Sequence, residues 1–322
     1  MTVETKRSKG RMKQRLEEID FLRCVLILLM ITFHIVYIGD TYAFAKQFVY
    51  TFHMPAFLLV SGYLCNTDKK MATFMKSMMW IFIPYLVMET AYVVMASLLP
   101  IREHIDNITP MLLFDKIFLH PLGPYWYLHT WILCSMVCYF AMRLRAIKPM
   151  LRFLVAVAGC LLLGFCGLVS LPNAMYFMAG AMISLLGMRF LAVFHPAWWA
   201  VLPVLSIALF MPSQLDRATI GGMAIVFFMI SFILYIYRFT SSRMRRPLLF
   251  VGRNTLLLLL FSPIFTAVSK LYQPLFLSFD PSGFSFCIVT VTIATLGSLL
   301  IGHVSDLLRL SPFFFGKEKA VN

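Results

Sequence analysis

The chain has 322 residues, of which 61% are hydrophobic and 13% are charged, and its mean hydropathy is +0.84. A soluble globular domain averages about 45–50% apolar and about 25% charged residues, so this composition argues against a water-soluble protein. Apolar runs of about 17 to 22 residues alternate with short polar segments, and a helix of this length crosses a bilayer. Strands of a transmembrane β-barrel are shorter, about 10 residues, and alternate in polarity. The sequence therefore predicts an all-α fold, a polytopic transmembrane helical bundle.

The basic residues do not indicate a nucleic-acid-binding protein. The net charge is +14 and the pI is about 9.6, but Lys and Arg lie between the apolar runs instead of on one amphipathic face. The basic N-terminus precedes an apolar run, as in a signal peptide, yet Arg23 and His34 lie within that run and no small-residue cleavage pattern follows. We therefore expect a retained first helix, membrane lipid as the surrounding partner, and no nucleic acid.

About ten spans follow one another along the chain. They are predicted at 19–38, 48–65, 77–99, 125–142, 153–170, 174–188, 197–211, 219–237, 248–271 and 284–302. With the N-terminus in the cytoplasm, 21 of the 28 Lys and Arg residues fall in cytoplasmic segments and four in outer loops. Because basic residues collect in cytoplasmic segments, we expect both termini there. The predicted organisation is a basic cytoplasmic N-terminal tail at 1–18, a transmembrane domain at 19–304 and a cytoplasmic C-terminal tail at 305–322.

The first predicted span contains two ionisable residues, Arg23 and His34. On an ideal helix their separation corresponds to about 16 Å of rise and about 20° beyond three turns, so both side chains point to the same side. Ionisable residues at membrane depth are costly unless they face a cavity or a partner. One interpretation is a functional stripe. The other is that Arg23 is an anchor reaching the membrane surface and His34 a hydrogen-bonded packing residue.

Three further polar residues are expected inside the next three spans. His53 lies near the outer end of the second span, at about the depth of the histidine in the first, and Pro55 frees a backbone carbonyl nearby. Glu89 lies in the middle of the third span, where a carboxylate must be protonated or paired. His129 lies in the fourth span, after the aromatic segment 125–127, which also fits an interfacial belt. A packing role for His53 in a kinked helix remains open.

Two other kinds of site have weaker support. The histidines and the glutamate come from separate spans and lack the H-E-x-x-H spacing, so we expect no metal site. The segment 252–256, Gly-Arg-Asn-Thr-Leu, opens the ninth span. A polar helix N-terminus of this kind binds phosphate or simply caps its helix.

Taken together, these residues resemble the acyltransferase 3 family of bacterial integral membrane O-acyltransferases, nearest to its fucose 4-O-acetylase-like branch. Most of the matching motifs lie in the first four predicted spans. They are Ile-Asp-Phe-Leu-Arg at 19–23 with His34, Phe-His-Met-Pro-Ala-Phe at 52–57, Ser-Gly-Tyr at 61–63, Pro-Tyr at 84–85 and Tyr-Trp-Tyr-Leu at 125–128. The segment 252–256 is similar to the family's Gly-Lys-Asn-Ser-Leu stretch.

The chain departs from the family pattern at a few positions. Many members have a histidine where Ser262 stands. Many also have a pair of arginines before the Pro-Tyr, where this chain has only Lys76, with Ser77 and Trp80 nearby. These departures concern the contacts to the acyl donor and the acceptor chemistry.

The resemblance implies transfer of an acyl group, commonly acetyl, from a cytoplasmic acyl-CoA such as acetyl-CoA. The acceptor would be a hydroxyl of a cell-surface glycan or a lipid-linked saccharide, and the location the bacterial inner membrane. No permanently bound cofactor is expected. Arg23, assisted by Lys76 and Arg253, would bind the donor phosphates, because a guanidinium holds phosphate oxygens in a fixed fork.

The resemblance also implies roles for the intramembrane polar residues. His34 would act as general base on the acceptor hydroxyl or as an acyl-carrying nucleophile. Glu89 would orient His34 or His53 and fix the tautomer of that ring. His53, Tyr127 and His129 would line the acceptor side. These assignments make the chain an enzyme, an O-acetyltransferase that modifies a polysaccharide.

Two functions without acyl transfer also fit a polytopic bundle. A polysaccharide or lipid transporter or flippase predicts paired halves, but no inverted repeat is visible and the polar residues cluster in the first four spans. A non-catalytic subunit of a polysaccharide exporter leaves His34, His53 and Glu89 unexplained. The acyltransferase interpretation accounts for more of the sequence than either.

Overall fold

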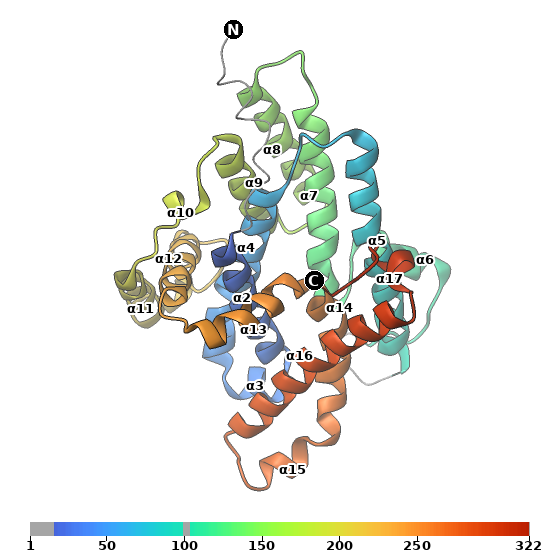
Figure 1. Ribbon diagram of the computed structural model, residues 1–322, viewed down its shortest axis with the longest axis vertical. Coiled ribbons are helices and arrows are strands. Elements are labelled where there is room, and N and C mark those ends of the chain that lie inside the picture. The colour runs from blue at the N-terminus through green and yellow to red at the C-terminus, as the bar shows by residue number, and fades with distance from the viewer. Residues whose placement is uncertain (1–15, 99–103, 322) are drawn as a thin grey trace.

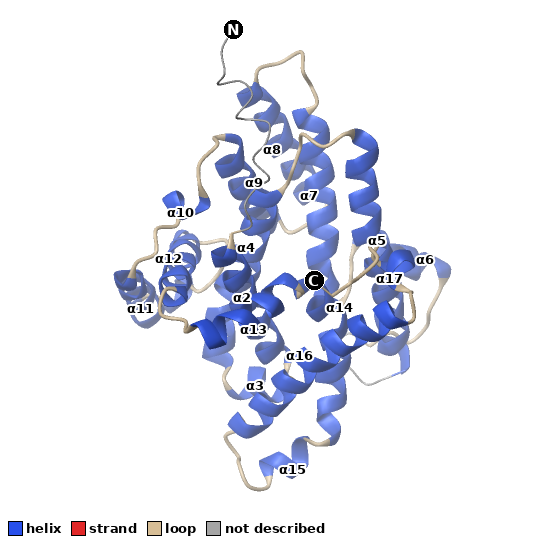
Figure 2. Cartoon of the chain, in the orientation of Figure 1, coloured by secondary structure: helices blue, strands red, loops and turns tan. Residues whose placement is uncertain are grey.

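The computed structural model describes residues 16–98 and 104–321. These residues form helices joined by loops, and none of them lies in a strand (Figure 2). The predicted all-α fold is confirmed.

Eleven longer helices form the body of the described chain (Figure 1). They are α2 (Glu17–His34), α4 (Ala43–Leu64), α5 (Met71–Leu98), α7 (Trp126–Met142), α8 (Pro149–Phe165), α9 (Leu171–Leu185), α11 (Val201–Phe210), α12 (Ile220–Tyr237), α13 (Ser242–Arg253), α14 (Thr255–Val268) and α16 (Phe284–Leu307). Short helical segments connect them: α3 (Val36–Thr41), α6 (Pro110–Phe114), η1 (Asp115–Leu119), η2 (Gly123–Tyr125), α10 (Phe190–Val193), η3 (Trp198–Ala200), η4 (Pro212–Gln214), η5 (Ser269–Leu271), α15 (Gln273–Leu277) and α17 (Ser311–Phe314).

The chain is a helical membrane protein. Among the described residues, α5, α12 and α16 are long and apolar enough to cross a membrane, and α13 with α14 adds a fourth crossing if the two form one bent span. Helices α8 and α9 and the segment Trp198–Phe210 are apolar but shorter. Each of the ten predicted spans overlaps at least one longer helix. The count of ten and the side on which the termini lie remain predictions.

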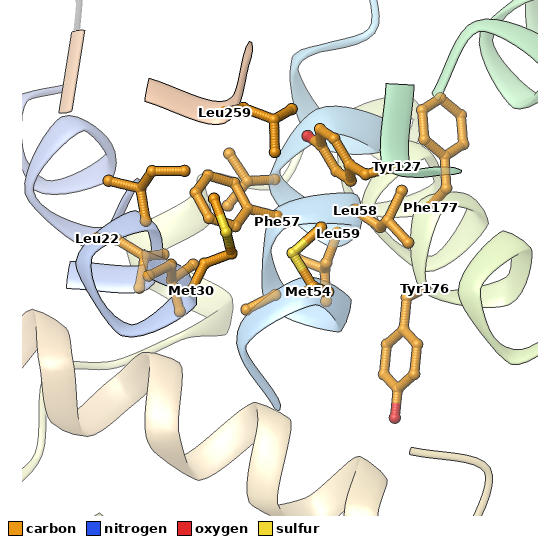
Figure 3. Packing of buried hydrophobic residues seen from close by; sticks show 14 of the residues in the cluster. Leu22, Met30, Met54, Phe57, Leu58, Leu59, Tyr127, Tyr176, Phe177 and Leu259 are labelled. Atoms are coloured by element: carbon orange, nitrogen blue, oxygen red, sulfur yellow. The ribbon is translucent and has the colours of Figure 1, made fainter. Parts of the chain in front are cut away.

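The centre of the molecule is built on a close contact between α4 and α9. A methyl group at Gly62 of α4 would overlap the carbonyl oxygen of Phe177, and one at Gly180 of α9 would overlap that of Leu59. Only glycine leaves room for two backbones at this separation. Figure 3 shows Leu58 and Leu59 packed beside Phe177 at this contact. The contact fixes α4, and with it the residues that face the cavities described below.

The predicted ninth span, 248–271, is not one straight helix. Helix α13 ends at Arg253, and the chain turns by 82° before it continues from Thr255. The Asn254 side-chain amide donates to the carbonyl oxygen of Phe250 at 2.8 Å, which satisfies an acceptor of the last turn of α13. Gly252 lies against the carbonyl oxygen of Asp20, so α13 crosses α2 in direct backbone contact. This crossing and the cap account for the bend.

The first predicted span, 19–38, is also interrupted. Helix α2 ends at His34, Ile35 adopts an extended conformation with φ −69° and ψ 110°, and α3 follows. Arg23 and His34 nevertheless belong to the same uninterrupted helix. The prediction that they share one helix is confirmed.

The two predicted tails differ in what the structure describes. Residues 1–15 of the tail at 1–18 lie outside the described residues, and Glu17 and Glu18 already belong to α2. The tail at 305–322 folds back, because the Asp306 carboxylate accepts from the Ser311 hydroxyl at 2.5 Å and from the backbone N–H of Ala320 at 2.6 Å. A carboxylate near the end of α16 therefore anchors the C-terminal segment.

Candidate active site

Three cavities open along one side of α2, and each is named here by the residue that characterises it. The arginine cavity, about 130 Å³, is lined by Arg23. The histidine cavity, about 420 Å³, is lined by His34 and His53. The lysine cavity, about 400 Å³, is also lined by His34, together with Lys46 and Lys270. Arg23 and His34 thus open into different cavities along the same helix.

The arginine cavity and the histidine cavity meet at two apolar side chains. Met54 of α4 and Leu259 of α14 line both cavities. Figure 3 shows the two residues among the buried side chains between α2 and α4. A thin apolar partition therefore separates the surroundings of Arg23 from those of His34.

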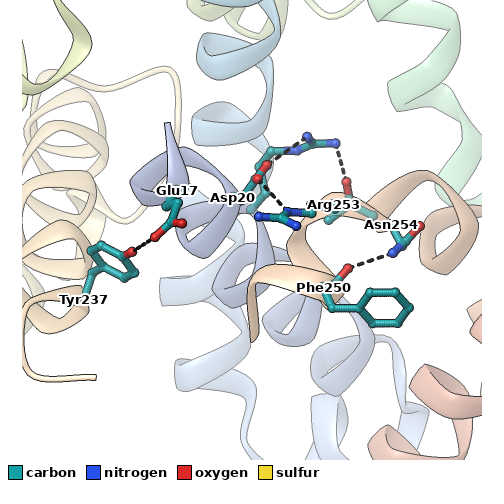
Figure 4. Close-up of polar contacts among 8 residues, drawn as sticks. Glu17, Asp20, Tyr237, Phe250, Arg253 and Asn254 are labelled. Carbon is teal, nitrogen blue, oxygen red and sulfur yellow. Dashed lines mark hydrogen bonds and ion pairs between the residues drawn. The ribbon is translucent and has the colours of Figure 1, made fainter. Parts of the chain in front are cut away.

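Two arginines and one carboxylate form a cluster at the Arg23 end. The Asp20 carboxylate, whose side chain is 5% exposed, lies 3.3 Å from Nε of Arg253 and 3.9 Å from Nη1 of Arg23. Arg23 also donates to the hydroxyl of Thr255, the first residue of α14, at 2.5 Å. Figure 4 shows Asp20 beside Arg253 at the bend before α14. Arg23 and Arg253, both predicted to bind the donor, thus share one carboxylate partner, Asp20, which sequence reasoning did not assign, and Arg23 also contacts Thr255.

Backbone carbonyls fix the rings of the two histidines that line the histidine cavity. Nδ1 of His34 lies 2.7 Å from the carbonyl oxygen of Met30, and Nδ1 of His53 lies 2.8 Å from that of Val49. A carbonyl oxygen only accepts, so each neutral ring carries its proton on Nδ1 and its lone pair on Nε2. Nε2 is the atom that a general base needs.

Tyr50 packs between the two histidines. Its ring centroid is 5.9 Å from that of His34 and 5.1 Å from that of His53. Sequence reasoning missed this residue, although its position one helical turn before His53 places it on the same face of α4. The two histidines, predicted at about the same depth, line one cavity.

His129 and Tyr127 are separated by the structure. His129 lines the histidine cavity, and its Nε2 donates to the carbonyl oxygen of Phe118 at 2.9 Å. Tyr127 lines the arginine cavity instead, with its hydroxyl 2.7 Å from that of Ser61. The two residues are two positions apart on α7, so they point to different sides of the helix. The structure therefore places the two residues, both predicted on the acceptor side, at different cavities.

Glu89 contacts a loop rather than a histidine. Its Oε1 accepts from the backbone N–H of Leu122 at 2.6 Å, and Glu89 does not line the arginine, histidine or lysine cavity. The rings of His34 and His53 are oriented by backbone carbonyls, as described above. The contact of Glu89 therefore positions the segment before α7, which is a different task from the predicted orientation of a histidine.

The remaining predicted residues lie at varied distances from the cavities. Lys76 is on an exposed face of α5 and does not line the arginine cavity. Ser262 is buried and lines the lysine cavity with His34. The Ser77 hydroxyl donates to the carbonyl oxygen of Thr73 at 2.8 Å, and Gly316 lies against the ring of Trp80. Of the departures from the family pattern, Ser262 alone lines a cavity that contains His34.

A hydrogen-bonded pair, Asp115 of η1 and His120, lies beside the histidine cavity before α7. His120 lines the cavity, and its Nδ1 lies 2.7 Å from Oδ1 of Asp115. The hydrogen bond from His120 holds the pKa of the Asp115 carboxyl below its usual value. In the described part of the chain, no group of three His, Cys, Asp or Glu residues is placed to hold a metal ion.

Comparison with known proteins identifies one related family. The acyltransferase domain of the acyltransferase 3 family matches residues 16–303, a range that contains α2 to α14 and most of α16. No curated protein and no solved structure matches the chain.

Proposed function

Because the chain belongs to the acyltransferase 3 family, we propose that it is an integral membrane O-acyltransferase that takes an acyl group, in the simplest case acetyl, from acyl-CoA. The acceptor is a hydroxyl of a cell-surface glycan or a lipid-linked saccharide. The enzyme works in the bacterial inner membrane. Its motifs favour the fucose 4-O-acetylase-like branch of the family.

One observation carries this proposal. Arg23 and His34 lie on the same side of α2, about 16 Å apart along its axis, and open into two cavities that share Met54 and Leu259. Acyl-CoA is a long donor with phosphates at one end and the thioester at the other. Its use therefore requires a phosphate-binding group and, farther along, a base. The donor enters from the Arg23 end, and the acceptor occupies the histidine cavity.

The donor end uses the arginine cluster. Arg23 and Arg253 bind phosphate oxygens of acyl-CoA, and the N-terminus of α14 adds its partial positive charge. Asp20, shared between the two guanidinium groups, holds them close together. Lys76, on the exposed face of α5, does not belong to this site.

The chemical step uses the free Nε2 of a histidine. Nε2 of His34 removes the proton from the acceptor hydroxyl while the oxygen attacks the thioester carbonyl carbon. The C–S bond then breaks, the thiolate of CoA leaves, and the histidine returns the proton to that sulfur. In the alternative order Nε2 itself attacks the carbonyl carbon, the C–S bond breaks and the CoA thiolate leaves. The acceptor hydroxyl then attacks the acyl-histidine, the ring is released, and the hydroxyl proton goes to the thiolate. His53 and His129 contact the acceptor. Glu89 positions the loop before α7, while backbone carbonyls orient the rings of His34 and His53.

The test is transfer of labelled acetyl by the full chain purified in lipid nanodiscs. Acetyl-CoA labelled in the acetyl group is supplied with lipid-linked saccharides extracted from membranes. His34→Ala should lower transfer by about 10²-fold or more, because a positioned base contributes about that much. Arg23→Ala should raise the KM for acetyl-CoA. His303→Ala, which changes an exposed histidine on α16, is the matched control and should leave both values unchanged.

The same experiment separates the two orders of reaction. Label on the protein in the absence of acceptor identifies His34 as acyl carrier, whereas no such label identifies it as base. Undiminished transfer by a folded His34→Ala protein contradicts the proposed function.

A further inference from the structure

The described residues lining the histidine cavity include two buried polar atoms without a hydrogen-bond partner. Nε2 of His53 and Oδ1 of Asn173 have no hydrogen-bond partner among the described residues, and both residues line the cavity. His53 is 2% exposed and Asn173 is 1% exposed. A buried polar atom without a partner is costly, so a native protein usually pairs it with a ligand or an ordered water. Both atoms accept hydrogen bonds, as a ligand with hydroxyl groups would require.

A cation is held at the same cavity by a well-anchored loop. Arg217 lines the histidine cavity, and its carbonyl oxygen accepts from the hydroxyl of Tyr176, which lies one turn after Asn173 on α9. The loop is also tied to α4 by the amide of Gln47, which donates to the carbonyl oxygen of Leu215 at 3.3 Å. The Arg217 guanidinium lies 5.9 Å from the ring centroid of Trp126. These contacts keep Arg217 beside Asn173.

No described carboxylate side chain lines the histidine cavity with Arg217, although Arg217 also lines a second opening with Asp40 and Asp216. No Asp or Glu is among the described residues that line the histidine cavity or the neighbouring lysine cavity. The carboxylate of Asp216 accepts from the backbone N–H of Ala218 at 2.7 Å and so is engaged in its own turn. Among the described residues, no ion pair includes Arg217. The neighbouring lysine cavity is lined by Lys270 and by Lys46, which pairs with Asp40 at 3.7 Å.

We propose that Asn173, His53 and Arg217 bind the acceptor, and that this acceptor is a saccharide with an anionic group, a carboxylate or a phosphate. The inference rests on the proposed function, since it takes the histidine cavity as the acceptor side. Arg217 binds the anion, while Asn173 and His53 accept hydrogen bonds from sugar hydroxyls. The acceptor hydroxyl then lies next to His34.

Equilibrium binding to the purified full chain in nanodiscs, without acyl-CoA, tests this assignment. The probes are methyl β-D-glucoside, methyl β-D-glucuronide, methyl β-D-glucoside 6-phosphate and inorganic phosphate. Both anionic sugars should bind about tenfold more tightly than the neutral one, the usual gain from one hydrogen bond to a charged group. Inorganic phosphate should bind more weakly than the sugar phosphate, because it does not reach Asn173 and His53. The two anionic sugars together show which anion the site prefers.

Three variants assign the effect to residues. Arg217→Gln should abolish the preference for the anionic sugars, and Arg217→Lys should keep part of it. Asn173→Leu should weaken all three sugars about equally. Arg238→Gln changes an exposed arginine at the opposite end of α12 and should alter nothing. Equal affinity of the wild-type protein for neutral and anionic sugars, or a preference that survives Arg217→Gln, overturns the assignment.

A parallel assay with acetyl-CoA keeps the two proposals distinguishable. Anion-dependent sugar binding without any acetyl transfer contradicts the proposed function but leaves a saccharide site at Arg217. Acetyl transfer with no preference for anionic acceptors supports the proposed function and contradicts the assignment of Arg217.

Discussion

Helices α4 and α16 have similar lengths but opposite surroundings. Every residue from 51 to 63 of α4 is buried. In α16 only 28% of the most apolar window is buried, and side chains such as Ile288, Leu296 and Leu300 are 60% to 67% exposed. The helix that qualifies as a span by length and hydropathy is at the outside, facing lipid, whereas the helix that carries His53 is enclosed by protein.

The difference follows from what each surface contacts. A lipid-facing helix must be apolar all along its exposed side, because hydrocarbon satisfies no polar group. A helix enclosed by other helices can carry histidines and serines, since neighbours and cavities satisfy them. Helix α2 shows the same effect, with Glu17, Glu18, Asp20 and Arg23 in its first two turns. The candidate site of this fold thus lies on helices whose hydropathy signal is weaker.

The largest effect is expected where the enclosed helix touches its neighbour. Gly180→Leu would force a side chain into the carbonyl oxygen of Leu59 and separate α9 from α4. Backbone overlap cannot be relieved by a rotamer change, so we expect a loss of about 3 kcal/mol or more and little folded protein. Ile288→Ala on the exposed side of α16 should change stability by much less. Thermal unfolding in nanodiscs measures both, and an equal shift for the two variants would remove the distinction between enclosed and outer helices.

A smaller effect is expected at the arginine cluster, where the enclosed helix α2 meets α13. Asp20→Asn keeps the shape of the side chain but removes the charge shared by Arg23 and Arg253. The guanidinium groups then lose their fixed positions, and the KM for acetyl-CoA should rise about fivefold to tenfold with less effect on kcat. Glu18→Gln, two positions earlier on α2, is the matched control. A change in kcat alone would argue that Asp20 acts on the chemical step instead of on donor binding.

Only part of the site could be predicted from sequence. The helices, and the alignment of Arg23 with His34, follow from local periodicity. The bend at Asn254 does not, because the apolar pattern runs through 248–271 and the decisive contact joins Gly252 to α2. The sequence did not identify Asn173 and Arg217 as candidate site residues for a similar reason. Each is ordinary in its own segment and becomes part of the site only when α9 and the loop before α12 lie beside α4.

The partner of Glu89 illustrates the same limit. A buried carboxylate in a span predicts a polar partner, and the structure provides one in the backbone N–H of Leu122. Sequence patterns locate side chains that need a partner, but backbone donors have no sequence signature. The family resemblance groups Tyr127 with His129 on the acceptor side, whereas the helical period directs them to different cavities.

The smallest effect is expected in the loop before α16, at the outside of the molecule. Hydrogen bonds lower the pKa of the Asp280 carboxyl well below its usual value. The largest contribution comes from the Ser282 hydroxyl, and the next come from the hydroxyl and the backbone N–H of Ser285. A lowered folded-state pKa stabilises the protein above the unfolded-state pKa of about 3.9, and the contribution is lost as the pH falls through the folded-state pKa. Asp280→Asn should therefore lower the Tm slightly at pH 7. The difference from wild type should shrink below about pH 4, and a difference independent of pH would show that the charge of Asp280 is not involved.

The apolar partition formed by Met54 and Leu259 also affects how well the membrane retains its proton gradient. Two wet cavities reached from opposite sides of a bilayer would form a conducting path if they were continuous, and protons would flow down their gradient. A constriction lined by apolar side chains expels water and blocks that flow. Under the proposed function, the flexible thioether of Met54 and isobutyl group of Leu259 would yield to an acyl chain and otherwise keep the two cavities apart, so that acyl transfer would not dissipate the proton gradient.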